Sequence, residues 1–480
     1  MFKLSVPLFI LKIFDDYSFV AYHNGTTCNI SSLTVNKLKL IKTKSALFEA
    51  VRFLKNKESS HQSNILFEHL NSMRKVNVGE VLYTPDIICR AYEYFAMRRS
   101  LYDRLCIDYK LPSIRTLTRL TSKISSMEDL NFVNSIFMNL DPLKKTFILL
   151  IDEVYVKASL LYQRGALFGQ AVNYPEKLAK TILSFMIKCL FGGPEFICRA
   201  QPIANLSSEF QFTQCQQIVD TINNIESSKT LAIITDGNRV NQRFFEMFET
   251  VDNKPWLTTS GIYLLYDYVH LFKSIRNNWL TEKTGQLQFL NNGELALAKW
   301  SNLETLYKTE CNSLFKLSKL TAKSVYPKPI ERQSVKFCLS VFCEETLRTH
   351  PEIENKAFEG TAVFIEKIIS FWNVVNVKAP GAGIRFRNEL CGEIHSVGDQ
   401  QLQLLRYIAE LSSYMKPTGK RVKQLTLDTS NAIAHTCYGL VDLVETLLSN
   451  RAKYVLLGWF TTDPLEKPFS KLRQGSGGTL

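Results

Sequence analysis

The sequence lacks the closely spaced cysteine pairs that hold structural zinc. Its eleven cysteines are scattered, and the two closest, Cys338 and Cys343, are five positions apart. A zinc ribbon needs two cysteines separated by two residues, so that class is excluded. The scatter is also unlike the framework of a small disulfide-rich secreted domain. We therefore expect a reducing intracellular compartment.

Long apolar runs and a phosphate-binding loop are missing too. The apolar stretch Leu4–Phe14 is too short to span a bilayer and is interrupted by Lys12. No small-residue cleavage site follows it, so we expect a strand or a buried helix there, and no contact with membranes. The nearest match to a Walker A loop, Thr418–Lys420, has Tyr414 in place of the first glycine and Arg421 after the lysine. This excludes an ordinary P-loop nucleotidase.

The composition is that of a folded protein with an excess of positive charge. Of 480 residues, 45% are hydrophobic and 21% are charged, which suits two or three domains with sizeable cores. The formal net charge of +13 favours a polyanionic partner such as DNA, although many basic proteins bind no nucleic acid.

Two short apolar runs each end on an aspartate. They are Phe147–Asp152 and Leu231–Asp236, and each reads as a buried strand. A carboxylate at the end of such a strand is costly to desolvate unless a cation or hydrogen-bond donors compensate it. With Glu466 in the later Asp463–Glu466 segment, the pattern predicts a carboxylate cluster for divalent metal. The alternatives are that Asp236 forms a turn before Gly237, and that Asp463 and Glu466 only cap a helix and interact with its dipole.

Such a cluster suits phosphodiester chemistry. Two magnesium ions roughly 4 Å apart can activate an attacking oxygen and stabilise a leaving one. Magnesium prefers hard oxygen ligands and retains several waters, so two or three carboxylates suffice. We expect Asp152 to bridge the ions, and Asp236 and Glu466 each to complete one ligand shell.

Residues 83–125 have the pattern of a helix-turn-helix. Pro85 begins a helix running to about Met97, Ser100–Tyr109 forms a second, and Ser113 caps a third from Ile114 to Ile124. From Thr84 to Ile124 there are eight Lys and Arg residues against four acids. The DNA-binding face of the last helix is predicted to consist of Arg115, Arg119 and Lys123. The alternative is a small helical domain with a solvated basic side.

The remaining chain reads as an α/β domain followed by helices. Phe147–Val156 and Ala166–Val172 are predicted to form a hairpin, and Ile182–Phe191 a further strand or a helix. A helix from Cys215 to Ile225, the strand Leu231–Thr235 and a helix from Val240 to Phe248 complete the order of an RNase H-like domain. Residues 278–450 read as mostly helical, including Leu402–Met415, Ile433–Leu448 and the stripe from Phe358 to Trp372.

These residues resemble the P-element-type (THAP-type) DNA transposases over roughly residues 80–478. The motifs occur in the family's order: Ile151–Glu153, Thr235–Gly237 with Asn241 and Phe245, Asp267–Asn278, Trp372–Lys378, and Asp463–Glu466 through Arg473 and Gln474. The resemblance implies an RNase H-like catalytic domain split by a mostly α-helical insertion that binds GTP. It also implies cut-and-paste DNA transposition with Mg²⁺ or Mn²⁺.

By motif position, Asp152, Asp236 and Glu466 take the three acidic roles of the DDE motif. The block containing His270, Lys273 and Arg276 is carried over as a DNA-contacting motif. Asn373, Asn376 and Asp463 occupy the nucleotide-binding positions. The resemblance further implies a nuclear protein that acts on DNA as a homo-oligomer, a dimer or a tetramer.

The chain departs from the family at three places. The family begins with a Cys/His zinc finger, and the first 50 residues here hold only Cys28 and His23. Asn373 replaces an aspartate, and an amide cannot accept both donors of guanine as a carboxylate can. Pro468 lies two residues after Glu466 within the expected helix and removes one backbone hydrogen bond. We therefore expect Asn373 to weaken the recognition of guanine, and Pro468 to tilt Glu466 and weaken metal binding.

These patterns predict the following division of the chain into domains. An N-terminal segment, 1–78, precedes a helix-turn-helix domain at 79–130. Within that segment, Leu38–Met73 is predicted to contain either a packing or dimerisation helix or an ordinary surface helix. The RNase H-like domain covers 135–277 and 451–480, with the helical insertion at 278–450. The predicted function is a DDE-type transposase core. The alternatives are a non-catalytic DNA-binding protein derived from a transposase, and a general metal-dependent nuclease.

Overall fold

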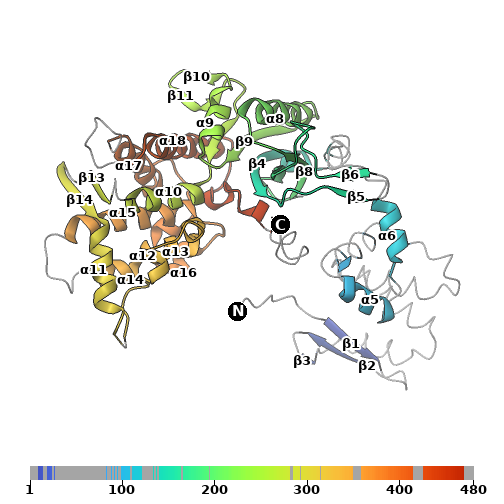
Figure 1. The fold of residues 1–480 in the computed structure, drawn as a ribbon, viewed down its shortest axis with the longest axis horizontal. Helices are drawn as coiled ribbons and strands as arrows, with labels where there is room; N and C mark the ends of the chain where they lie inside the picture. Colours follow the sequence, from blue (N-terminus) through green and yellow to red (C-terminus); the bar gives the residue numbers. More distant parts are fainter. Residues whose placement is uncertain are drawn as a thin grey trace. The chain divides into compact units, whose positions relative to one another are not determined.

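The computed structural model divides the chain into two compact units, residues up to Ser125 and residues from Ser126 onward. It describes residues 9–13, 19–23, 26–27, 83, 88, 91, 94–95, 99–108, 111–121, 133, 137, 140–163, 166–193, 195–281, 285–291, 293–313, 315–349, 358–414, 425–466 and 468–469. The elements are labelled in Figure 1.

The first unit contains a small sheet and helices. Strands β1 (Phe9–Ile13), β2 (Phe19–His23) and β3 (Thr26–Thr27) pair antiparallel in that order. The strand alternative for the apolar stretch near the N-terminus is therefore confirmed. The predicted dimerisation helix in 38–73 lies outside the described residues.

Two of the three predicted helices of the helix-turn-helix pattern are described. They are α5 (Arg99–Asp108) and α6 (Ile114–Thr121). The predicted cap is present, because the Thr116 backbone N–H donates to Ser113 Oγ at 3.1 Å. A small core of Ala91, Tyr102 and Leu117 holds this region together.

The second unit is built on a seven-stranded mixed sheet with the order β10-β11-β12-β9-β4-β7-β8. Its strands are β4 (Thr146–Tyr155), β7 (Thr181–Cys189), β8 (Glu195–Ile203), β9 (Lys229–Thr235), β10 (Thr250–Val251), β11 (Lys254–Thr258) and β12 (Tyr263–Tyr266). Strands β4, β9 and β12 run parallel, while β7 is antiparallel to both β4 and β8. The carboxyl ends of the three parallel strands therefore meet at one edge.

Helices cover the central strands. Every residue from Phe147 to Ile151 and from Thr230 to Thr235 is buried, so both faces of β4 and β9 are covered. Helix α8 (Ser208–Asn223) packs on β9, and α9 (Arg239–Glu246) packs on α8. Helices α10 (Tyr268–Leu280) and α18 (Leu427–Ser449) pack together, and α18 lies on β11 and β12.

Several strand predictions need correction. The antiparallel partner of β4 is β7. The segment after Arg164 and Gly165 forms only the short strand β6 (Ala166–Phe168), which pairs with β5 (Leu161–Gln163). Strand β8 was not predicted, and the Ile182–Phe191 segment is a strand, β7. Helix α8 begins seven residues before the predicted start at Cys215, because Ser207 Oγ caps it by accepting from the Phe210 N–H.

The region from 278 to 450 is mostly helical, as predicted, but includes the hairpin of β13 (Gln286–Asn291) and β14 (Glu294–Lys299). Its main helices are α11 (Trp300–Glu310), α12 (Ala322–Val325), α13 (Val335–Val341), α14 (Glu344–Arg348), α15 (Glu359–Val375), α16 (Ala382–Phe386) and α17 (Gln400–Tyr414). Within this region, η3 (Glu331–Gln333) and η6 (Glu389–Cys391) are short 3-10 turns. Two more 3-10 turns, η2 (Pro142–Lys144) and η7 (Leu457–Trp459), lie outside it.

The predicted domain boundaries cut through elements of this fold. The boundary at 277/278 falls inside α10, and α18, assigned to the insertion, packs on the central sheet. Gly439 shows how close that packing is, because a Cβ there would lie 2.7 Å from Leu265 Cδ2. In the described part of the chain, no helix combines the length and apolarity needed to cross a membrane.

Candidate functional site

Asp152 and Asp236 lie at the carboxyl ends of neighbouring parallel strands. Leu150 of β4 pairs with Ile234 of β9, and each aspartate follows its paired residue by two positions. Alternate residues point to the same face, and adjacent strands are about 4.8 Å apart. The two carboxylates therefore lie side by side at one edge of the sheet, as the sequence predicted.

Glu466 also acts electrostatically on Asp152. The pKa of Asp152 rises from 3.8 to about 8, mainly because the group is buried and then because of the negative charge of Asp236. The charges of Glu466 and Asp267 contribute further, while the Glu153 N–H, which donates to Asp152 Oδ1 at 2.8 Å, partly offsets the rise. Folding thus gathers carboxylates that are far apart in the sequence.

Asp236 is held by local donors at the start of α9. Its Oδ1 accepts from the Asn238 N–H at 3.0 Å and from Asn241 Nδ2 at 2.6 Å. Asn238 also caps the helix by accepting from the Asn241 N–H. Asp236 therefore forms the turn that was given as the alternative, and it also lies beside Asp152.

Asp267 is a site residue that the sequence reading did not single out as an acid. It follows β12, caps α10 through the Val269 N–H, and is 1% exposed. It also accepts from Thr461 Oγ1 at 3.1 Å, and from the Thr462 N–H at 3.3 Å and its hydroxyl at 2.5 Å. This carboxylate fastens the segment that carries Glu466 to the edge of the sheet. A signal existed, because the apolar run Tyr263–Tyr266 also ends on an aspartate.

The C-terminal helix forms despite its proline. Residues 463–466 and 468–469 are helical, with Pro468 half-buried and Glu466 exposed. Asp463 lies within this helix and pairs with Lys378, so the capping role proposed for it differs from what the structure shows. The dipole role of Glu466 stays a prediction.

Asp152, Asp236 and Glu466 offer the type of ligand atom that a divalent cation prefers, but their side chains are not arranged around a common metal position. Among the described residues, no group of three or more His, Cys, Asp or Glu side chains is arranged to hold a metal ion. The donors of Asp152, Asp236 and Glu466 are all hard carboxylate oxygens, which magnesium and manganese prefer. Burial, and then the negative charge of Asp236, raises the pKa of Asp152, and a bound cation would offset both effects.

The predicted nucleotide-binding residues come from α15 and its C-terminal cap and from the segment that carries Glu466. Asn376 ends α15, and its Oδ1 accepts from the Tyr268 hydroxyl at 3.2 Å. Asp463 forms an ion pair with Lys378 at 2.5 Å. Asn373 is half-buried on α15. Two of the three side chains are therefore already engaged by protein partners.

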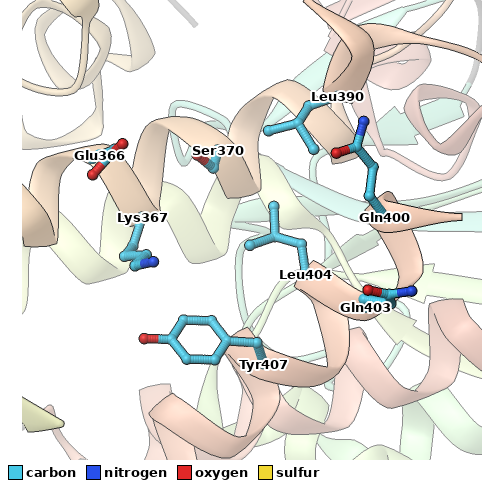
Figure 2. A pocket seen from close by; sticks show the side chains of 8 residues that line it. All are labelled: Glu366, Lys367, Ser370, Leu390, Gln400, Gln403, Leu404 and Tyr407. Carbon is cyan, nitrogen blue, oxygen red and sulfur yellow. The ribbon is translucent and has the colours of Figure 1, made fainter. Parts of the chain in front are cut away.

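A separate pocket of about 350 Å³ lies between α15 and α17 (Figure 2). Its lining is mixed, and Lys367 Nζ lies 5.0 Å from the centre of the Tyr407 ring. The lining residues are Glu366, Lys367, Ser370, Leu390, Gln400, Gln403, Leu404 and Tyr407. None of the predicted site residues lines it.

The cationic residues of α10 are more buried than a DNA-contacting motif requires. Arg276 is fully buried, and its guanidinium donates to Asn277 Oδ1 at 2.9 Å and to the Arg332 carbonyl. Lys273 is 9% exposed, with Nζ 3.5 Å from His270 Nε2. Burial lowers the pKa of Arg276. In this structure Arg276 joins α10 to η3, and a DNA contact would need these elements to separate.

The predicted DNA-binding residues of the first unit are described only in part. Arg115 is exposed on α6. Arg119 belongs to α6, but its side chain lies outside the described set, as does the whole of Lys123. Their role in DNA binding stays a prediction.

We expect the raised pKa of Asp152 to make the metal-free protein less stable as the pH rises. Between pH 4 and pH 8 the Asp152 carboxyl keeps its proton in the folded state but has lost it in the unfolded state. The contribution of this proton to the free energy of unfolding is therefore fully present below about pH 4 and is lost as the pH rises towards 8. Each pKa unit corresponds to about 1.4 kcal/mol. Asp152→Asn should therefore exceed the wild type in free energy of unfolding at pH 8 by at least about 2 kcal/mol, and differ little at pH 4.

The measurement is urea denaturation in EDTA between pH 4 and pH 8. Added Mg²⁺ should narrow the gap at pH 8, because a cation replaces the missing proton. A difference between the two proteins that stays constant over this pH range would contradict the assigned coupling.

No model of a known protein family matches the chain, and no curated protein sequence matches it. The solved structure described as the Drosophila P element transposase strand transfer complex is similar to it, with a TM-score of 0.68 and 17% sequence identity. The match covers 91% of this chain and 95% of that chain. The chain therefore has the fold of that transposase.

Proposed function

We propose that this chain is the core of a DDE-type DNA transposase with an RNase H-like catalytic domain. The observation that carries the proposal is that Asp236 and Glu466 both act electrostatically on Asp152, although the three acids come from separate parts of the sequence. The strand order β8-β7-β4-β9-β12, with β7 antiparallel, supports the RNase H-like assignment. The fold similarity to the P element transposase supports the reaction class.

The residues divide the work of phosphodiester chemistry. Asp152, Asp236 and Glu466 hold divalent metal, and Asn241 orients Asp236 through its amide. Asp267 positions the helix of Glu466 by holding Thr461 and Thr462. When bound, Mg²⁺ or Mn²⁺ supplies activation of the attacking oxygen and stabilisation of the leaving oxygen. Asp152 must give up its proton to serve as a ligand, and the positive charge favours that ionised form.

The remaining features of the proposal follow from the same class of reaction. DNA is the substrate, and the formal net charge of +13 supports binding to it. We also propose a homo-oligomer and a nuclear location, because transposition joins two DNA ends to a chromosomal target.

The direct test is a DNA cleavage and joining assay with the full chain. Duplex DNA carrying candidate terminal repeats is incubated with Mg²⁺, Mn²⁺, Ca²⁺ or EDTA. We expect strand cleavage with Mg²⁺ or Mn²⁺, joining of the freed 3′ end to a second duplex, and no product in EDTA. Cleavage that persists in EDTA would contradict the proposed site.

One observation favours a second candidate, a DNA-binding protein without catalysis. In the described part of the chain the acids form no closed ligand set, and Asp236 is already engaged by two local donors. This candidate predicts DNA retention in a gel-shift experiment with no product under any metal condition.

Guanine selectivity is expected to be weak. Asn373 presents only one acceptor where a carboxylate would present two, so GTP and ATP should bind within roughly tenfold of each other. Asn373→Asp should increase affinity for GTP by roughly tenfold and leave ATP binding unchanged. Calorimetric titration measures both, with Asn373→Ala as the control. A strong GTP preference in the wild type would show that other residues read the base.

A further inference from the structure

The hairpin of β5 and β6 is apolar on both of its faces. Leu161 pairs with Phe168 on one face, and Tyr162 with Leu167 on the other. Their exposed fractions are 56%, 53%, 73% and 49% in that order. A two-stranded hairpin with no covered face is marginal in water, so this one favours a partner. Figure 1 draws it as a separate hairpin beyond the end of β4.

The base of the hairpin is fixed to the main sheet. Gly169 has a φ of +105°, and a Cβ there would lie 2.0 Å from the Ser159 carbonyl oxygen. The Ala179 N–H donates to the Gly169 carbonyl at 2.8 Å, and the Val156 N–H donates to the Lys180 carbonyl at 2.8 Å. The exposed side chains are therefore presented from an anchored support.

The charges around the hairpin favour a polyanion. Between residues 155 and 180, the described residues include three exposed lysines, Lys157, Lys177 and Lys180, and one acid, Glu176. Lys177 Nζ lies 4.4 Å from the centre of the Tyr174 ring, so cation and aromatic surface are combined. A second copy of this chain would bring lysines against lysines in a two-fold contact, which counts against self-association here.

The hairpin also follows directly from the strand of the candidate site. Tyr155 ends β4, three residues after Asp152, and is 75% exposed. At about 3.3 Å per residue, its backbone lies roughly 10 Å from that of Asp152 along the strand. Since Tyr155 follows Asp152 by an odd number of positions, its side chain lies on the opposite face of the strand, and the exposed rings and lysines lie beyond the end of β4.

We propose that Tyr155 and the β5–β6 hairpin form a stacking surface for unpaired nucleotides of the DNA held at the carboxylates. This inference rests on the proposed function and adds the part of the DNA that is bound and how. Tyr155 supplies one ring, and Tyr162 and Phe168 supply one ring on each face of the hairpin. Bases stack on such rings without regard to sequence. The lysines contact the adjoining phosphates and make the binding salt-dependent.

The test measures affinity of the full chain in EDTA for two DNAs of the same sequence. One is a fully paired duplex, and the other is a fork with short unpaired arms. In the double variant Tyr155→Ala with Tyr162→Ala, each lost tyrosine should weaken the affinity for the fork by roughly tenfold or more. The affinity for the duplex should change little. Replacing both tyrosines by phenylalanine should preserve fork binding, because the rings remain. Phe315→Ala, at a residue 85% exposed elsewhere, is the matched control.

A 5-iodouracil placed in the unpaired arm supplies a direct readout, because it should crosslink to Tyr155, Tyr162 or Phe168. Fork affinity unchanged in the double alanine variant would overturn the inference, while metal-dependent cleavage by the wild type would leave the proposed function intact. A wild-type oligomer that becomes monomeric in the variant, with DNA affinity unchanged, would assign the hairpin to a second copy instead. Failure of the wild type to bind either DNA would overturn both proposals.

Discussion

Asp152→Asn should abolish metal-dependent cleavage while leaving DNA binding intact. The side chain retains its size but loses the charge at the centre of the acidic group, whose members Asp236 and Glu466 act on it electrostatically. Metal-ion catalysis lowers the barrier by several kcal/mol, so we expect a loss of at least roughly 1,000-fold in the rate of the first strand cut. Single-turnover cleavage with Mg²⁺ measures this loss.

A matched control separates the site from general charge effects. Asp252→Asn makes the same chemical change at an exposed carboxylate in the turn between β10 and β11, and it should cleave at the wild-type rate. Equal rates for the wild type and Asp152→Asn would remove Asp152 from the catalytic role. Loss of DNA binding in Asp152→Asn would point to misfolding, which a thermal melt would detect.

Asp267→Ala should give the largest loss of stability among the predicted variants. The substitution removes the cap of α10 and the acceptor for Thr461 and Thr462, all of them buried. A lost cap costs about 1 kcal/mol, and each buried donor left without a partner costs about 1–3 kcal/mol. We expect a decrease of roughly 3–5 kcal/mol in the free energy of unfolding, measured by urea denaturation.

The same variant should release the segment that carries Glu466. Hydrogen exchange at the Thr462 amide should accelerate far more than exchange in β9, which stays in the sheet. Asp267→Asn retains an acceptor for the cap and should lose about half as much stability. If exchange rises uniformly across both segments, Asp267 stabilises the fold as a whole without specifically fastening Glu466.

The sequence was informative where the local pattern and the fold agree. Apolar runs ending at Asp152 and Asp236 do form adjacent parallel strands, because continuous aliphatic residues suit a strand covered on both faces. The caps of α6 and the helical character of α15 and α17 also follow from short-range signals.

The errors come from long-range pairing. Strand β4 could pair with Ala166–Val172 or with the later β7, and only the folded sheet decides between them. Strand β8 contains Arg199 and Pro202, which obscure its apolar alternation, although Arg199 is buried through hydrogen bonds to Gln214 and Gln217 of α8. Asp267 was missed as an acid of the site because its partners, Thr461 and Thr462, lie almost 200 positions later.

The hydrogen bonds that Asp267 accepts from Thr461 and Thr462 can form only after the ribosome has made residues 461 and 462. Asp152, Asp236 and Asp267 are made before the helices of the 300–450 region, and the segment that ends in Glu466 is made after them. Until that segment is made, the nascent chain holds an incomplete acid group. Under the proposed function, nuclease activity is therefore withheld until the segment that carries Glu466 has folded against Asp267, without any inhibitor.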